Sequence, residues 1–135
     1  MSIALIHLIY PMYLYPIYVD KPETMVSTAI VEVEWQDFVA TAYVSDCEGC
    51  TGITMSGYDV RNTIYSPEGY RVIAVDPNFI PLGTLVEIEA NGERFKAKAM
   101  DIGGAIKGRK IDLLIGSVSD AYKWGVREVR LRVIK

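Results

Sequence analysis

The sequence predicts a mainly β protein that folds as a small closed or nearly closed barrel with one helix. Many short runs of β-forming residues are separated by turns, one segment alone has the features of a helix, and the chain contains no internal repeat. Short, turn-separated strands without repeats are typical of small barrels.

The composition fits a folded domain and excludes one class of partner. The chain has 135 residues, of which 50% are hydrophobic and 23% are charged, so it is long and apolar enough to bury a sizeable core. Its net charge of −3 provides no basic surface for a polyanion. We therefore predict no nucleic-acid partner.

The N-terminal segment is apolar but irregular. Residues 3–19 contain Pro11 and Pro16, and no lysine or arginine precedes Lys21. A secretory signal begins with a basic region, and a transmembrane helix needs about 20 apolar residues. We expect residues 1–35 to form an arm packed on the barrel or on a partner. A degenerate anchor or signal, with membrane contact by residues 3–19, is the alternative.

Three strands are predicted in the first half of the remaining chain. Alternating apolar and polar residues favour a strand at 26–34, and β-forming residues favour others at 38–44 and 53–57. An irregular loop is expected at 58–70. Its tyrosines are available either for ligand contact or for an amphipathic surface.

Cys47 and Cys50 form a lone C-x-x-C motif. A structural zinc site takes four ligands, and a thioredoxin-type pair follows a strand and opens a helix. We expect these cysteines to form a disulfide across the loop or to remain thiols, with a partial metal site and redox catalysis as alternatives.

The second half of the chain contains the clearest elements. A strand at 71–75 is ended by a proline, and a hairpin joins 84–90 to 93–100 through an Asn-Gly turn. A two-residue turn pairs two glutamates with two basic residues on one face and apolar residues with each other on the opposite face. These pairs are Glu89–Arg94, Glu87–Lys96, Ile88–Phe95 and Val86–Ala97.

The C-terminal elements are a strand, a helix and a final strand. Residues 110–115 form an apolar run that carries an aspartate, and 129–133 alternate in the period of a strand. Between them, Ser117 with Asp120 resembles a capping box, and Gly125 follows Trp124 as a helix stop.

Three aspartates at the edges of strand-like runs are the candidate catalytic residues. Asp101 and Asp112 bracket a loop with three glycines, and Asp76 follows the strand at 71–75. With one histidine in the chain, carboxylate chemistry is favoured over a nucleophile–histidine pair. Like-charge repulsion between Asp101 and Asp112 would raise the pKa of one of them. The alternative is that these aspartates cap turns through backbone hydrogen bonds.

The same residues resemble the three-aspartate (3D) domain family over residues 38–135. The resemblance is carried by an ordered set of motifs: TAY at 41–43, TMSG at 54–57, AVDP at 74–77, IPLGT at 80–84, DIGGAIKG at 101–108 and KID at 110–112. It implies a six-stranded double-psi β-barrel with one or two short helices over residues 36–135. That barrel is related to the catalytic barrel of membrane-bound lytic transglycosylase A and to expansin-like barrels.

The resemblance also implies an activity and a site. Members of the family cleave the β-1,4 bond between N-acetylmuramic acid and N-acetylglucosamine in peptidoglycan and leave a 1,6-anhydro product. Asp112 matches the general acid/base, Asp101 its supporting carboxylate and Asp76 the third aspartate. The expected substrate-binding residues are Thr41, Tyr43, Thr54, Lys107, Gly103 and Gly104. No metal or cofactor is implied.

Two other functions remain as alternatives to the lytic transglycosylase. One is a hydrolysing muramidase, and the other is a non-catalytic wall-binding module. The expected partner is the peptidoglycan glycan strand, and the expected place of action is the bacterial cell wall, reached by secretion or delivered by a phage. No oligomeric state is predicted.

Overall fold

The computed structural model describes residues 34–135. The strand expected at 26–34 and the expected arm or anchor at 1–35 fall outside this range, except for residues 34 and 35. Within the described range, the single helix is too short and too polar to cross a membrane.

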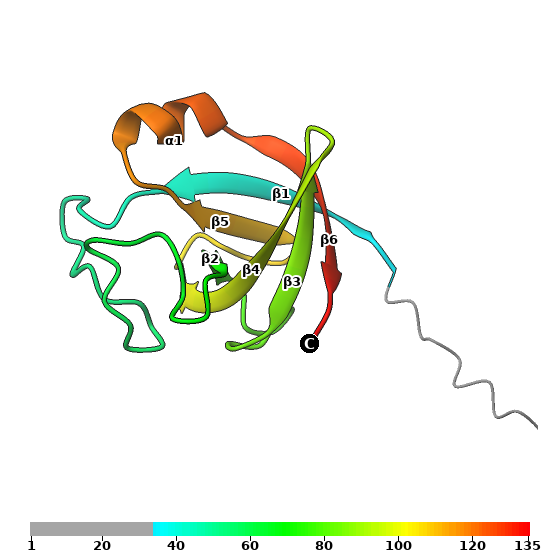
Figure 1. The fold of residues 1–135 in the computed structure, drawn as a ribbon, viewed down its shortest axis with the longest axis horizontal. Coiled ribbons are helices and arrows are strands. Elements are labelled where there is room, and N and C mark those ends of the chain that lie inside the picture. The colour runs from blue at the N-terminus through cyan, green and yellow to red at the C-terminus, as the bar shows by residue number, and fades with distance from the viewer. Residues whose placement is uncertain (1–33) are drawn as a thin grey trace, which may run out of the picture. The chain divides into compact units, whose positions relative to one another are not determined.

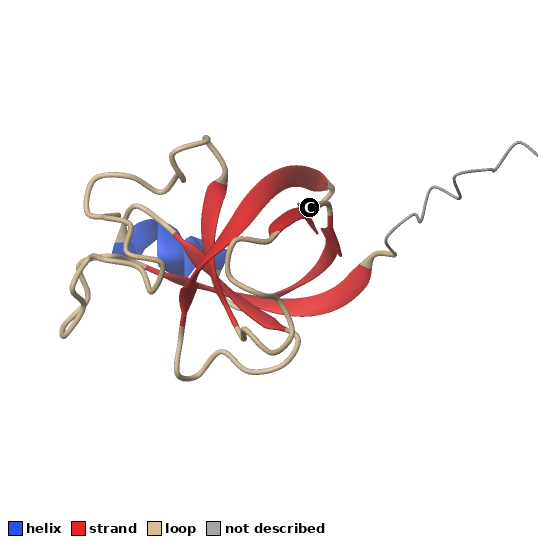
Figure 2. Cartoon of the chain, turned by 90° about the horizontal axis from the view of Figure 1, so that it is seen from below, coloured by secondary structure: helices blue, strands red, loops and turns tan. Residues whose placement is uncertain are grey.

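Six strands close into a barrel in the order β1-β5-β2-β4-β3-β6, and one short helix lies to one side (Figures 1 and 2). The mainly β barrel predicted from the sequence is therefore confirmed. The elements are β1 (Gln36–Tyr43), β2 (Arg71–Val75), β3 (Leu85–Ala90), β4 (Glu93–Ile102), β5 (Lys110–Leu114), α1 (Val118–Trp124) and β6 (Arg127–Val133).

The strands bury apolar residues on both of their faces. Successive residues of a strand point to opposite sides, so Ile73 and Val75 of β2 lie in the main core inside the barrel. Val72 of the same strand belongs to a second, smaller cluster with Met100 and Leu114. Val60 joins this cluster from the long loop between β1 and β2, which therefore packs on the outer side of the barrel.

The β3–β4 hairpin has the predicted register. Asn91 and Gly92 both adopt positive φ angles, 52° and 78°, as the tight turn requires. All four predicted cross-strand pairs are present.

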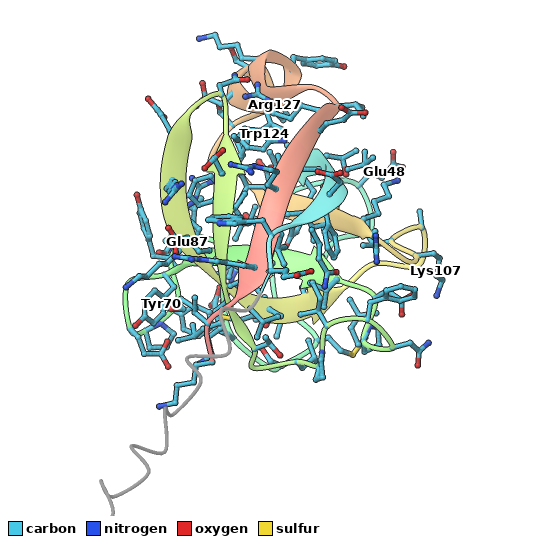
Figure 3. The ribbon with its side chains drawn as sticks, turned by 90° about the vertical axis from the view of Figure 1, so that its right-hand side faces the viewer. Glu48, Tyr70, Glu87, Lys107, Trp124 and Arg127 are labelled. Carbon is cyan, nitrogen blue, oxygen red and sulfur yellow. A yellow bond between two sulfur atoms is a disulfide. The ribbon has the colours of Figure 1, made fainter. Side chains whose placement is uncertain are left out.

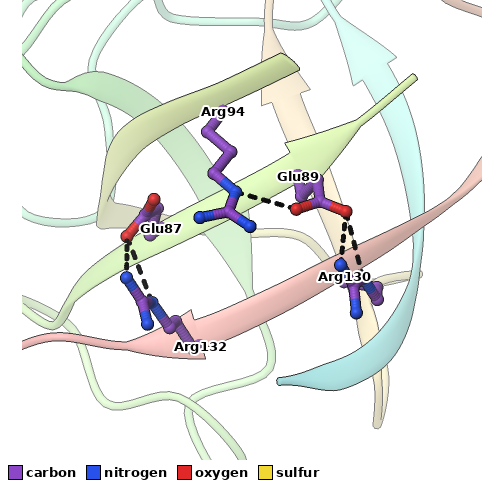
Figure 4. Close-up of polar contacts among 5 residues, drawn as sticks. All are labelled: Glu87, Glu89, Arg94, Arg130 and Arg132. Atoms are coloured by element: carbon purple, nitrogen blue, oxygen red, sulfur yellow. Dashed lines mark hydrogen bonds and ion pairs between the residues drawn. The ribbon is translucent and has the colours of Figure 1, made fainter. Parts of the chain in front are cut away.

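The ion pairs of this hairpin extend beyond it to β6. Glu89 contacts Arg94 as expected, but Glu87 pairs with Arg132 instead of Lys96 (Figure 4). Glu87 and Arg132 are register neighbours because β3 also pairs with β6, a contact that local sequence does not reveal.

The prediction of a strand at 53–57 is wrong. This segment makes one isolated bridge, between Ile53 and Asp59, and is otherwise built of turns. The Thr54 hydroxyl accepts the Tyr58 N–H at 3.1 Å, so a side chain satisfies the backbone where a strand partner would otherwise do so. The irregular loop over 58–70 is confirmed.

The expected helix is confirmed together with its caps. Ser117 accepts the Asp120 N–H at 3.1 Å, and the Gly125 N–H donates to the Ala121 carbonyl. Cys47 and Cys50 form a disulfide within the β1–β2 loop.

Asp76 connects two loops at one end of the barrel. It follows β2 directly, is only 5% exposed, and accepts the N–H of Asn78 at 3.0 Å and that of Gly108 at 2.9 Å. These backbone donors, together with the nearby charge of Lys107, hold the pKa of Asp76 below its usual range. The carboxylate thus joins the β2–β3 loop to the glycine-rich β4–β5 loop.

We expect Asp76→Asn to lower the midpoint of thermal unfolding at neutral pH, because an amide cannot accept both N–H donors as a carboxylate does. A depressed folded-state pKa stabilises the fold above the ordinary aspartate pKa, and this stabilisation is lost as the pH falls through the depressed value. The difference between wild type and variant should therefore shrink on acidification. Circular dichroism melts between about pH 7 and about pH 2 measure it.

Asp37→Asn is the matched control, because Asp37 is exposed on β1. A difference between wild type and Asp76→Asn that stays constant at all pH values would contradict an ionised, hydrogen-bonded Asp76.

Candidate active site

Two of the three aspartates lie in one row across four neighbouring strands. Thr41 of β1 is in register with Asp112 of β5, Asp112 is in register with Ala74 of β2, and Ala74 is in register with Asp101 of β4. Register neighbours point to the same side of a sheet. Two strand spacings separate the aspartate Cα atoms by about 10 Å. Ala74, which is 3% exposed, lies between the two aspartates in this row.

A β-bulge in β4 places Asp101 in this row. The register between β2 and β4 changes from Ile73–Ala99 to Ala74–Asp101, so Met100 is an extra residue. Without it, strict alternation would send Asp101 into the barrel core with Ala97 and Ala99. The sequence analysis expected Asp101 just past the end of its strand, but β4 continues through Ile102.

Asp112 is half-buried and prefers its protonated form more than an ordinary aspartate does. Burial raises the pKa of this carboxyl, and the charge of Asp101 raises it further. The Thr41 hydroxyl donates to Asp112 Oδ1 at 2.9 Å and, with Lys110, acts in the opposite direction. Burial is the larger cause of the raised pKa of Asp112, whereas the sequence had suggested repulsion by the charge of Asp101.

Asp101 accepts hydrogen bonds on both carboxylate oxygens. Oδ1 accepts the N–H of Met55 and that of Ile102, each at 2.9 Å. Oδ2 accepts the Tyr43 hydroxyl at 3.1 Å. Burial and the charge of Asp101 hold the pKa of Tyr43 well above its usual range, so Tyr43 remains a proton donor. Met55 was missed from the sequence because it contributes only a backbone group.

Two of the predicted substrate-binding residues, Thr54 and Lys107, occupy different kinds of position. Thr54 is only 4% exposed and shares a hydrogen bond of 2.9 Å with Ser56, so it shapes the turn that presents Met55. Lys107 is exposed at an edge of the molecule (Figure 3), where its charge acts on Asp76.

The two predicted glycines of the β4–β5 loop differ from each other. A Cβ at Gly103 would lie 2.6 Å from Ile106 Cγ1, whereas one at Gly104 would meet open space. Gly103 is therefore required for packing, and Gly104 leaves the backbone accessible.

The structure thus brings together Asp101, Asp112, Thr41 and Tyr43, while Asp76 bonds to loop backbone instead. A hollow of about 140 Å³ opens beside Asp101, and we call it the acid hollow. It is lined by Tyr43, Val44, Ser45, Cys50, Thr51, Gly52, Ile53, Val60 and Asp101. Residues 34–135 contain no cluster of three or more metal-ligating side chains.

A second hollow of about 440 Å³ adjoins the acid hollow, and we call it the middle hollow. Ser45 and Val60 line both hollows. The middle hollow continues along the β1–β2 loop over Arg61–Tyr65 and reaches the end of β5 at Leu114. Asp101 therefore lies beside the first of two adjoining hollows, and Asp112 lines neither of them.

Comparison with known proteins places this site in a family. The 3D domain family model matches residues 71–135. The SPbeta prophage-derived uncharacterized protein YorM of Bacillus subtilis is 47% identical over 78% of this chain. The cell wall-binding protein YocH of the same organism is 48% identical over 70% of this chain. The chain spans 44% and 31% of their lengths.

Solved structures were compared as well. One of them is the Escherichia coli lytic transglycosylase MltA with bound chitohexaose, which is 26% identical to this chain. The alignment covers 62% of this chain and 27% of MltA, with a TM-score of 0.48. The Streptomyces papain inhibitor is 18% identical over 77% of this chain and 98% of its own, with a TM-score of 0.53, and shares the fold. All three aspartates lie within residues 71–135, and this part of the chain matches the 3D domain.

Proposed function

We propose that this chain binds peptidoglycan and cleaves its β-1,4 bond between N-acetylmuramic acid and N-acetylglucosamine as a lytic transglycosylase. One observation carries the proposal: the half-buried Asp112 has a raised pKa and shares one face of the sheet with a second carboxylate, Asp101, two strands away. A carboxylic acid that stays protonated is suited to protonating a glycosidic oxygen. The 3D domain supports a cell-wall substrate.

In the proposed reaction Asp112 acts first as an acid and then as a base. Its proton moves to the glycosidic oxygen while the bond from that oxygen to C1 of the muramic acid breaks. The resulting carboxylate takes the proton of the muramic-acid 6-hydroxyl, whose oxygen bonds to C1. The products are a free sugar hydroxyl and a 1,6-anhydro ring. No water is consumed, and Asp112 regains its proton.

The contacts of Asp101 favour this single-acid mechanism over a double-displacement hydrolysis. A carboxylate that attacks C1 needs a free lone pair aimed at the sugar. Asp101 already accepts two donors on Oδ1, from Met55 and Ile102, and one on Oδ2, from Tyr43, so its orientation is fixed by the protein and one acceptor site on Oδ2 remains. Such a carboxylate is suited to stabilising the positive charge that develops on the sugar and to raising the pKa of Asp112.

The names of the relatives support a location at the cell wall. YocH is named a cell wall-binding protein. Bacillus subtilis YabE, which is named a putative cell wall shaping protein, is 44% identical over 70% of this chain and 22% of its own length. YorM is prophage-derived, so a wall-directed role in either a cell or a phage fits. Peptidoglycan glycan strands are the proposed partner.

A non-catalytic wall-binding module is the second candidate, and the printed name of YocH favours it. In that case the row of carboxylates would bind sugar hydroxyls without breaking a bond. The two candidates differ in their products, not in their affinity for the wall.

We expect Asp112→Asn to lower the release of anhydro-muropeptides from purified peptidoglycan by about 10²- to 10⁴-fold, the usual contribution of a general acid. Binding to the wall should persist, because the amide keeps the shape of the side chain. Mass spectrometry of the released fragments measures the activity, and co-sedimentation with insoluble peptidoglycan measures binding.

Asp37→Asn is again the control and should release as much as the wild type. Fragments with ordinary reducing ends would identify a hydrolase. Intact wall binding by the wild type without any release would establish the binding module.

Thr41→Val tests the environment of Asp112. The Thr41 hydroxyl stabilises the charged carboxylate, so its loss should raise the pKa of Asp112. The acid form would then persist to higher pH, and the alkaline limb of the rate–pH profile should move upward. Initial rates of fragment release across the pH range measure this shift. An unchanged or downward-moving limb would contradict the assignment, and Thr84→Val serves as the control.

A further inference from the structure

Arg71 occupies an unusual environment at the start of β2. Its side chain is half-buried, and its guanidinium carbon lies 6.0 Å from the centre of the Tyr65 ring and 5.7 Å from that of Phe95. One terminal nitrogen donates to the Leu114 carbonyl at 2.8 Å. Its Nε atom is buried and has no hydrogen-bond partner among the described residues.

Arg71 has no carboxylate partner within residues 34–135. Four other arginines there, Arg61, Arg94, Arg130 and Arg132, each form an ion pair. Burial lowers the pKa of Arg71, and the neighbouring Tyr65 acts in the opposite direction. A buried cation without an anion is costly, and an external anion would remove that cost.

A hollow of about 610 Å³ opens beside Arg71, and we call it the arginine hollow. It is lined by Tyr65, Gly69, Tyr70, Arg71, Glu87, Glu93, Arg94, Phe95 and Lys96. Figure 3 shows Tyr70 and Glu87 at the edge of the molecule opposite Lys107.

The charges that line this hollow are only partly neutralised. Arg94 is held by Glu89, and Glu87 is held by Arg132 (Figure 4). Within the described part of the chain, Lys96 and Glu93 take part in no ion pair. Arg71 and Lys96 are therefore available to an anion, and Glu93 to a cation.

The arginine hollow neighbours the hollow beside Asp101 through shared lining residues. It shares Tyr65 with the middle hollow, which shares Ser45 and Val60 with the acid hollow. Arg71 lies three residues before Ala74 on β2, about 10 Å along the strand, and its side chain leaves the opposite face of the strand. A peptide of five residues spans up to about 17 Å, so a peptide attached to a sugar beside Asp112 can reach Arg71.

We propose that the arginine hollow binds a free carboxylate of a short peptide, namely the peptide branch of the glycan strand that is cleaved at Asp112. This inference rests on the proposed function and adds a peptide requirement to it. Arg71 and Lys96 bind the carboxylate, Tyr65 and Tyr70 pack on the aliphatic parts, and Glu93 accepts an amine of the peptide. A polyphosphate chain fits less well, because Glu87 and Glu93 would repel it.

The test uses the full chain carrying Asp112→Asn, so that ligands are not cut. Isothermal titration calorimetry compares soluble glycan fragments that retain their peptides with fragments whose peptides an amidase has removed. We expect the peptide-bearing fragments to bind about tenfold more tightly, the value of one charge-assisted hydrogen bond.

Adding Lys96→Glu should abolish this tenfold difference and leave binding of the bare glycan unchanged. Lys96 is exposed, so the substitution spares the fold. Lys123→Glu on α1 is the matched control and should retain the difference. Arg71→Gln, once circular dichroism shows it to be folded, should behave as Lys96→Glu does.

Equal binding of both fragments would overturn the proposal, as would a loss on bare glycan equal to that on peptide-bearing glycan. Competition by purified teichoic acid, but not by the free peptide, would assign the hollow to phosphate instead. Failure of the cleavage proposal remains distinguishable: peptide-dependent binding without anhydro products overturns cleavage alone, and anhydro products with peptide-independent binding overturn the arginine hollow alone.

Discussion

Strand residues alternate between the interior of a barrel and its outside, and the bulge at Met100 shifts that alternation by one residue. Ala97 and Ala99 fill the interior before it, and Asp101 follows it on the outside. An unpaired carboxylate inside this core would have a desolvation cost of several kcal/mol. The hydrogen bonds to Tyr43 and Met55, and the proximity to Asp112, all depend on the shift.

Desolvation and hydrogen bonding act on Asp76 and Asp112 in different proportions. Asp76 is almost fully buried, yet backbone N–H donors dominate and its carboxylate stays charged. Asp112 is less buried, yet desolvation dominates because a single hydroxyl bonds to it. The two shifts thus follow the donors and the desolvation of each group: two backbone N–H groups lower the pKa of Asp76, and burial with one hydroxyl donor raises that of Asp112.

Local patterns predicted much of the fold because they were redundant. In the β3–β4 hairpin the Asn-Gly turn, the charge pairs and the apolar pairs all required one register, and the structure has it. The segment at 53–57 offered β-forming residues alone, and Thr54 used its hydroxyl to stabilise turns instead.

The site was predicted to a different extent. The motifs identified which aspartates to consider, but Asp101 and Asp112 were expected on neighbouring strands, and β2 lies between β4 and β5 in the barrel. The bulge, the backbone donor at Met55 and the unpaired Arg71 arise from contacts between strands far apart in sequence. No window of neighbouring residues contains that information.

The loop between β1 and β2 has a consequence for how such a barrel diversifies. Residues 44–70 supply lining to all three hollows, whereas the aspartates come from the strands and turns that follow. The family model likewise begins at residue 71, after this loop. Exchange of this one contiguous segment can thus alter the lining of the three hollows while the aspartates stay in place, provided that the backbone donor from Met55 to Asp101 is retained.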